Sequence, residues 1–170
     1  MAAIRSRRAV VGVIGLGYVG LPLALAAVEA GFPVLGFDIN PARVEAISAG
    51  RQVINYLDPT AQRSALDSGR FSATTDFTRL AEADAVILCV PTPVTRNRDP
   101  DLSYVRASAA SAAAVLRPGQ LVVLESTTWP GTTAEVVRPL LEAGGLAVGE
   151  EVFLAFSPER EDPGNAHYGT

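Results

Sequence analysis

Residues 10–20 read VVGVIGLGYVG, an apolar run that leads directly into three glycines, Gly15, Gly17 and Gly20. A stretch that fits a helix follows, and the next apolar run ends at Asp38. In a dinucleotide-binding turn the first glycine permits a tight turn, the second lets backbone approach a pyrophosphate, and the third brings the helix close to the sheet. The pattern predicts such a site, because a strand precedes it and an acid follows about 20 residues later.

The acid at position 38 bears on which dinucleotide binds. A carboxylate at the end of the second strand accepts hydrogen bonds from ribose hydroxyls and repels a 2′-phosphate, so Asp38 favours NAD over NADP. It also argues against the alternative of a glycine-rich turn that binds nothing. Arg43 can pair with a phosphate or stack on adenine, and beside Asp38 we interpret it as an adenosine-side contact. A solvated arginine on a short helix is the alternative for Arg43.

Composition and charge restrict the class of protein. A chain of 170 residues with 48% hydrophobic and 19% charged side chains fits one globular domain with a sizeable core. The net charge of −4 gives no basic footprint for nucleic acid. The apolar runs are short and broken by glycine and proline, which predicts no membrane span, and no metal-ligand spacing occurs. A single cysteine fits a reducing compartment, so we expect a cytoplasmic protein.

Short apolar runs alternate with alanine-rich helical stretches along the chain. This alternation predicts an α/β class, with a Rossmann-type doubly wound, mainly parallel sheet and helices on both faces. Strands are expected at residues 9–14, 34–37, 71–73, 85–90, 121–124 and 152–155. Helices are expected at residues 18–30, 41–49, 60–67, 77–82, 102–116 and 133–143. Loops are expected at residues 50–59 and 91–101.

The loop after the fourth predicted strand is a candidate site. Ligands of an open parallel sheet lie outside the carboxyl ends of its strands. Residues 89–93 read CVPTP, and Pro91 and Pro93 stiffen the chain on both sides of Thr92. We expect this loop to contact the adenosine-side ribose or the pyrophosphate.

The loops after the fifth and sixth strands are richer in hydroxyls and charges. Residues 125–133 read ESTTWPGTT and lead into a helix, so the two final threonines could act simply as N-caps. Ser126 and Thr127 precede the cap, and we expect them to face the crevice. Residues 156–165 read FSPEREDPGN, a charged run held by prolines at the mouth of the same crevice.

Five motifs therefore occur in a fixed order along the chain. They are GLGYVGLPLA at 15–24, FDIN at 37–40, CVPTP at 89–93, ESTTWPGTT at 125–133 and FSPEREDPGN at 156–165. Their order and spacing resemble the N-terminal domain of the UDP-glucose/GDP-mannose dehydrogenase family, nearly from end to end. Residues 91–104, together with the last motif, look most like the branch that acts on UDP-N-acetylglucosamine or UDP-N-acetylmannosamine.

The resemblance implies an oxidoreductase of polysaccharide biosynthesis that oxidises the C6 alcohol of a UDP-sugar to a carboxylate with two NAD⁺. In such enzymes a cysteine captures the aldehyde as a thiohemiacetal, a second oxidation gives a thioester, and water cleaves it. The resemblance further implies a UDP-N-acetylhexosamine substrate and a homodimer or larger assembly of the full-length enzyme.

The resemblance also assigns roles to positions of this chain. Glu159 matches the family's acid/base carboxylate, and Thr127 matches the residue that helps to position water. The family's second glutamate falls on Pro163, so that role has no equivalent side chain here. The expected cofactor contacts, to which the fingerprint adds Gly20 and the proline loop adds Pro91, are Gly15, Gly17, Tyr18, Val19, Gly20, Asp38, Arg43, Pro91, Thr92 and Ser126.

The family's nucleophilic cysteine and the lysine and asparagine that support it are expected beyond this chain. Cys89 is the one thiol and falls in an apolar strand, where a free cysteine behaves as a small hydrophobe. We expect residues 1–170 to form the NAD-binding domain, with the central and C-terminal UDP-sugar-binding domains absent. An isolated NAD-binding module without turnover is one alternative. The first domain of a β-hydroxyacid-type dehydrogenase is another, although its glycine-rich substrate loop is not evident.

Overall fold

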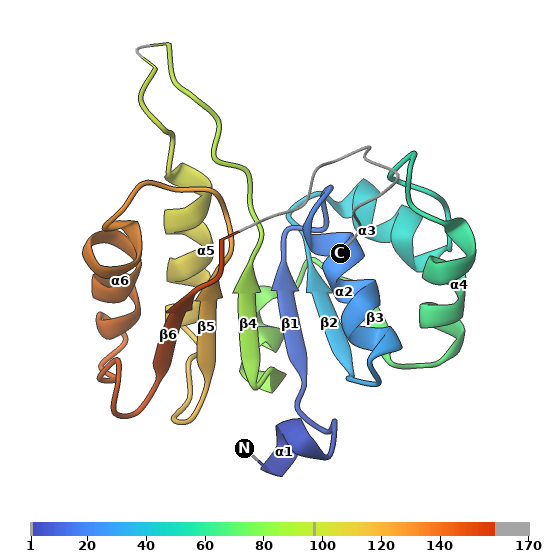
Figure 1. Ribbon diagram of the computed structural model, residues 1–170, viewed down its shortest axis with the longest axis horizontal. Helices are drawn as coiled ribbons and strands as arrows, with labels where there is room; N and C mark the ends of the chain where they lie inside the picture. The colour runs from blue at the N-terminus through green and yellow to red at the C-terminus, as the bar shows by residue number, and fades with distance from the viewer. Residues whose placement is uncertain (1, 97, 159–170) are drawn as a thin grey trace.

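A single parallel β-sheet organises the molecule (Figure 1). The computed structural model describes residues 2–96 and 98–158. Within them, six strands lie in the order β3-β2-β1-β4-β5-β6, which is the order of a doubly wound dinucleotide-binding sheet. The strands are β1 (Val11–Ile14), β2 (Val34–Phe37), β3 (Phe71–Thr74), β4 (Ala85–Leu88), β5 (Leu121–Leu124) and β6 (Phe153–Phe156). The predicted α/β class and doubly wound sheet are confirmed.

Helices cover both faces of the sheet. A short helix, α1 (Ala2–Arg5), precedes β1. One face carries α2 (Gly20–Glu29), α3 (Pro41–Ser48) and α4 (Pro59–Asp67). The other carries the 3₁₀ helix η1 (Phe77–Glu82), α5 (Ser103–Ala113), the π-helical turn η2 (Thr133–Val137) and α6 (Arg138–Glu142). Successive strands extend the sheet to one side from β1 to β3 and to the other side from β4 to β6, so the switch point where such sheets bind ligands lies between β1 and β4.

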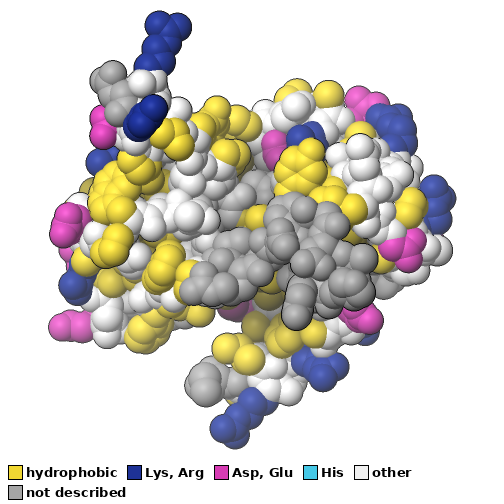
Figure 2. Space-filling model, turned by 45° about the horizontal axis from the view of Figure 1, so that its top comes forward, with side chains coloured by type: hydrophobic (Ala, Val, Ile, Leu, Met, Phe, Trp, Pro, Cys, Tyr) yellow, Lys and Arg dark blue, Asp and Glu magenta, His cyan; other side chains and the backbone are white. Residues whose placement is uncertain are grey.

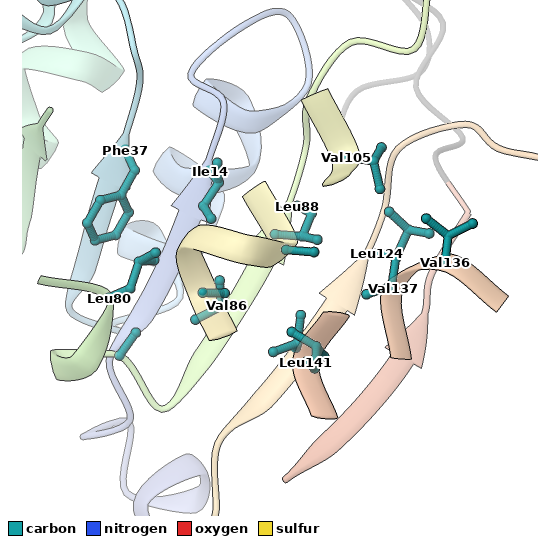
Figure 3. Close-up of a cluster of buried hydrophobic side chains, with 14 of the residues drawn as sticks. Ile14, Phe37, Leu80, Val86, Leu88, Val105, Leu124, Val136, Val137 and Leu141 are labelled. Atoms are coloured by element: carbon teal, nitrogen blue, oxygen red, sulfur yellow. The ribbon is translucent and has the colours of Figure 1, made fainter. Parts of the chain in front are cut away.

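Alternating side chains of the strands supply two separate cores. Ile14 packs with Leu88 and Leu124 under α5 and α6, as Figure 3 shows. Val13, the neighbour of Ile14, points to the opposite face and packs with Leu21 of α2. Successive strand residues alternate between the faces of a sheet, so both cores follow from the same short apolar runs.

Several expected elements differ from the structure in their bounds, as with residues 102–116, of which α5 spans Ser103–Ala113, and two of the differences have identifiable reasons. The strand expected over 85–90 ends at Leu88, because the Val90 N–H donates to the Ser126 hydroxyl at 3.0 Å instead of to a neighbouring strand. The helix expected over 133–143 is divided into η2 and α6. Pro139 lies at this division and has no N–H for a helical hydrogen bond, which accounts for the widened turn.

Candidate functional site

The parallel strands end in register, which gathers four loops at one edge of the sheet. Ile14 is paired with Phe37 on one side and with Leu88 on the other, and Leu88 is paired with Leu124. The next residue of each strand therefore lies beside its neighbour. Figure 2, which turns this edge toward the viewer, shows charged side chains mainly at the periphery of the described surface. Of the segments predicted to form the site, the glycine turn, Asp38 and the loops after β4 and β5 begin side by side here.

The structure requires glycine at some of the three fingerprint positions but not at all of them. Gly15 has a φ of +92°, and a Cβ there would lie 2.5 Å from the Cys89 carbonyl oxygen. A Cβ on Gly20 would lie 1.9 Å from the carbonyl oxygen of Gly15. A Cβ on Gly17 would meet no atom within 4 Å, and its φ is not in the left-handed region. The fold itself thus requires Gly15 and Gly20 but not Gly17.

Asp38 organises the same turn from the end of β2. One carboxylate oxygen, Oδ2, accepts a hydrogen bond from the Leu16 N–H at 3.1 Å, and Oδ1 accepts one from the Asn40 N–H at 2.9 Å. The side chain is 13% exposed. Asp38 is thus held with its carboxylate at the edge of the glycine turn, where a ribose of a bound dinucleotide is expected.

Arg43 is fixed against the turn as well. Its Nη1 donates to the Leu16 carbonyl oxygen at 3.0 Å, and its Nε lies 3.8 Å from Asp38 Oδ2. Asn40 caps α3 by accepting hydrogen bonds from the N–H groups of Ala42 and Arg43, which sets the direction of the helix. Arg43 is thus held with its guanidinium next to the Asp38 carboxylate, while its side chain is still 35% exposed.

The loops after β4 and β5 are tied together by two hydroxyl groups. The buried Ser126 hydroxyl accepts from the Val90 N–H at 3.0 Å and donates to the Leu88 carbonyl oxygen at 3.2 Å. The Thr92 hydroxyl donates to the Thr127 carbonyl oxygen at 2.7 Å. Ser126 therefore holds backbone in place, whereas Thr127 is exposed at the mouth of the crevice.

A small cavity of about 190 Å³ lies between these loops and the glycine turn. Its lining brings together several residues singled out in the sequence with two that were not, Val90 and Glu125. Glu125, the first residue after β5, was missed, although its place at the carboxyl end of a strand was a usable signal. Cys89 Sγ lies 4.0 Å from Glu125 Oε2. The cavity is lined by Val19, Cys89, Val90, Pro91, Thr92, Glu125, Ser126 and Thr127.

Cys89 and Thr132 both make contacts that stabilise the fold. Cys89 is 9% exposed and packs in the core beneath α2, as expected for a small hydrophobe. Thr132 does not act as a side-chain N-cap, because its hydroxyl donates to the Trp129 carbonyl oxygen at 2.9 Å. This bond closes the loop ahead of η2 and leaves Trp129 partly exposed at 40%.

Other predicted features fall outside this geometry. Glu159, the expected acid/base carboxylate, lies outside the described residues, as does most of the FSPEREDPGN motif. Among residues 2–96 and 98–158, no three His, Cys, Asp or Glu side chains are grouped in a way that could hold a metal ion. The helices in that part of the chain are all too short or too polar to cross a bilayer.

The sheet order, the glycine turn and the acid after β2 define a dinucleotide-binding domain of the Rossmann type. Residues 9–170 match the sequence profile of the UDP-glucose/GDP-mannose dehydrogenase family, NAD binding domain. The chain belongs to this family, and its cofactor is NAD. This membership does not favour the first domain of a β-hydroxyacid-type dehydrogenase.

Individual relatives support the same assignment. The chain is 38% identical over 161 residues to a UDP-N-acetyl-D-glucosamine 6-dehydrogenase of Pseudomonas aeruginosa, covering 93% of this chain and 37% of the relative. It is 39% identical over 166 residues to a UDP-N-acetyl-D-mannosamine dehydrogenase of Escherichia coli strain K12, covering 92% and 38%. The crystal structure of an NDP-N-acetyl-D-galactosaminuronic acid dehydrogenase from Methanosarcina mazei superposes with a TM-score of 0.87 at 35% identity, covering 95% and 36%. The chain thus spans little more than a third of these relatives' length.

Proposed function

We propose that this chain supplies the NAD-binding domain of a nucleotide-sugar 6-dehydrogenase. The whole protein would oxidise the C6 alcohol of a UDP-N-acetylhexosamine to the uronic acid, consuming two NAD⁺ and one water. The names of the relatives from Pseudomonas aeruginosa and Escherichia coli support this substrate class. Bound NAD⁺ would accept a hydride in each oxidation, and the residues of this chain would bind and orient it.

The open space around Gly17 is the observation that most strongly supports the proposed cofactor site. The fold leaves room for a side chain at this position, and the backbone conformation permits one. A glycine there gains no packing and adds conformational freedom to the unfolded chain. Its presence fits a requirement imposed from outside the protein, namely the close approach of a pyrophosphate to the turn.

The other predicted cofactor contacts have distinct proposed roles. Gly15 and Gly20 shape the turn, Tyr18 is exposed on it, and Val19 lines the cavity beside it. Asp38 would accept hydrogen bonds from the adenosine ribose, and Arg43 would line the adenosine side. Pro91, Thr92 and Ser126 would form the opposite wall, with Ser126 acting by holding the backbone of the β4 loop.

The catalytic assignments extend beyond the cofactor. Thr127 would help to position the hydrolytic water, which its exposed place at the mouth of the cavity permits. Glu159 would act as the acid/base carboxylate. The nucleophilic cysteine and the UDP-sugar contacts would come from regions beyond residues 1–170. A module that binds NAD without turnover is the second candidate, and steady NADH production from a UDP-sugar by this chain alone would exclude it.

The setting of the whole protein is part of the proposal. A location in the cytoplasm agrees with one free cysteine in the sequence and with the supply of NAD⁺ and nucleotide sugars there. A homodimer or larger assembly is proposed for the full-length enzyme. Sedimentation of the full-length protein tests this, and a monomer at working concentration would contradict it.

The test of the cofactor site is a Gly17→Ala variant, titrated calorimetrically with NAD⁺ and NADP⁺ beside the unchanged chain. The unchanged chain should bind NAD⁺ in preference to NADP⁺. The variant should lose at least about tenfold in NAD⁺ affinity, because the new methyl group holds the pyrophosphate away from the turn. Its thermal unfolding midpoint should not fall, since the methyl group enters open space. Equal NAD⁺ affinity in both proteins would contradict the proposal that the pyrophosphate lies against the turn at Gly17.

A further inference from the structure

Tyr56 reaches the glycine turn from a distant part of the sequence. It lies in the loop between α3 and α4, and its hydroxyl donates to the Tyr18 carbonyl oxygen at 2.7 Å. The rings of Tyr56 and Tyr18 stack with centroids 6.0 Å apart and an interplanar angle of 20°. Neither the fingerprint nor the resemblance assigns a role to Tyr56.

The Tyr18 carbonyl needs this partner because of Pro22. In α2, the Leu21 N–H donates to the Gly17 carbonyl oxygen at 3.2 Å and the Leu23 N–H donates to the Val19 carbonyl oxygen at 3.1 Å. The helical donor that falls between them belongs to residue 22, which is a proline and has no N–H. The first turn of α2 therefore leaves the Tyr18 carbonyl without its helical donor, and the Tyr56 hydroxyl takes that place.

The loop that carries Tyr56 is anchored on both sides. Ile54 is 2% exposed and packs in the core beneath α2. The side-chain amide of Gln52 donates to the carbonyl oxygens of Asn55 at 3.1 Å and Leu57 at 3.0 Å. The buried Gln62 amide ties α4 to the end of α3 by donating to the Ile47 carbonyl oxygen at 3.1 Å. Tyr56 is thus presented from a fixed platform.

We propose that Tyr56 is a positioning residue for the cofactor, which holds the turn of residues 15–20 in the conformation that receives the dinucleotide diphosphate. It acts through the Tyr18 carbonyl and replaces the hydrogen bond that Pro22 removes. This inference rests on the proposed NAD site. It adds a residue that lies 38 positions from Tyr18 in sequence.

The test compares Tyr56→Phe with Tyr104→Phe in the 170-residue chain. Both changes remove one phenolic hydroxyl from a partly exposed ring, and Tyr104 lies on α5, on the other face of the sheet. Tyr56→Phe keeps the ring stack and should weaken NAD⁺ and ADP-ribose about three- to tenfold, while adenosine binding stays unchanged. Amide hydrogen exchange should accelerate without any ligand at Leu21 and Leu23, whose N–H groups donate to carbonyl oxygens of the turn. Tyr104→Phe should change none of these.

A double substitution separates positioning from general stability. Pro22→Ala supplies the missing N–H, so Tyr56→Phe made in the Pro22→Ala background should weaken NAD⁺ binding less than in the original background. Equal losses in the two backgrounds, unchanged exchange at Leu21 and Leu23, or equal weakening of adenosine and ADP-ribose would each overturn the proposal. Failure of the unchanged chain to bind NAD⁺ would refute the proposed function. Accelerated exchange in Tyr56→Phe would still show that the Tyr56 hydroxyl holds the turn of residues 15–20 in place.

Discussion

The two ends of the β-sheet use their polar groups in different ways. At the amino ends, Arg117 donates to the carbonyl oxygens of Ala81 and Ala83 at 3.0 Å and pairs with Asp84 at 2.8 Å. Asp84 also accepts from the Val10 N–H at 2.9 Å. The buried Gln120 accepts from the Arg117 N–H and donates to the Ala83 carbonyl oxygen. These groups bond to one another and close that end of the molecule.

At the carboxyl ends, the polar groups bond to the chain but remain at a surface. Asp38 and Ser126 hold backbone N–H groups of the loops, while Thr127 and Tyr18 stay exposed beside them. We infer that the polar groups at the amino ends of the strands stabilise the sheet, whereas those at the carboxyl ends hold loops around a ligand. Substitutions at the two ends should therefore separate stability from cofactor binding.

Gly20→Ala should have the largest effect. It lies at the carboxyl end but should reduce both the stability of the fold and cofactor binding. Its methyl group would lie 1.9 Å from the Gly15 carbonyl oxygen, so the turn and α2 must move apart. We expect the unfolding free energy to fall by about 3 kcal/mol and NAD⁺ binding to disappear. Chemical denaturation and calorimetry measure the two effects. Gly17→Ala is the matched control, and equal stability of the two variants would contradict this account.

Asp38→Asn should change binding at the carboxyl end with a smaller effect. Loss of the charge should weaken NAD⁺ binding by about 1–2 kcal/mol. It also releases Arg43, which lies 3.8 Å from the carboxylate, to meet a 2′-phosphate, so the preference for NAD⁺ over NADP⁺ should narrow. Titration with both cofactors measures this. Asp67→Asn, at the exposed end of α4, controls for net charge, and an unchanged NAD⁺/NADP⁺ ratio in Asp38→Asn would count against the ribose contact.

Asp84→Asn should have the smallest effect, on stability alone. The hydrogen bond from Arg117, followed by that from the Val10 N–H, lowers the pKa of Asp84 below its ordinary value of 3.8. A lowered pKa in the folded state stabilises the protein above that ordinary value, and the contribution is lost as the pH falls through the folded-state pKa. Because both side chains are partly exposed, the variant should lose only about 1 kcal/mol near pH 7.

The pH dependence sharpens that prediction. The stability difference between the unchanged chain and Asp84→Asn should shrink progressively as the pH is lowered from 4 through the folded-state pKa of Asp84, since the carboxyl group is protonated first in the unfolded chain and only at lower pH in the folded one. Asp99→Asn, in the exposed loop before α5, is the matched control. NAD⁺ affinity should be the same in all three proteins. A difference that stays constant down to acid pH would show that the charge of Asp84 is not involved.

Local sequence patterns predicted most of the fold. The runs at 34–37 and 121–124 became β2 and β5 with the expected bounds, because turn-forming residues delimit short apolar segments. The glycine turn and Asp38 were placed correctly, since their spacing is set by one strand, one turn and one helix. The bounds of β4 were wrong by two residues, because Val90 bonds to Ser126, a side chain 36 residues away.

Contacts between distant segments explain what the sequence could not predict. The hydrogen bond from the Arg43 guanidinium to the Leu16 carbonyl oxygen joins residues 27 positions apart, and no local pattern predicts it. The bond from Tyr56 to Tyr18 joins two loops that no local pattern connects. The place of Glu125 directly after β5 could be inferred from the sequence, but its position in the cavity lining depends on β4 and β5 ending in register, which is set by sheet pairing.

Trp129 gives the molecule a built-in optical reporter. It is the one tryptophan of the sequence, and it is partly exposed in the loop that Thr132 closes beside the crevice. The indole emission of this 170-residue chain therefore comes from a single known place, near the wall proposed to face the cofactor. Intrinsic tryptophan fluorescence of this chain can therefore report ligand binding, loop motion and unfolding at that wall without an attached label.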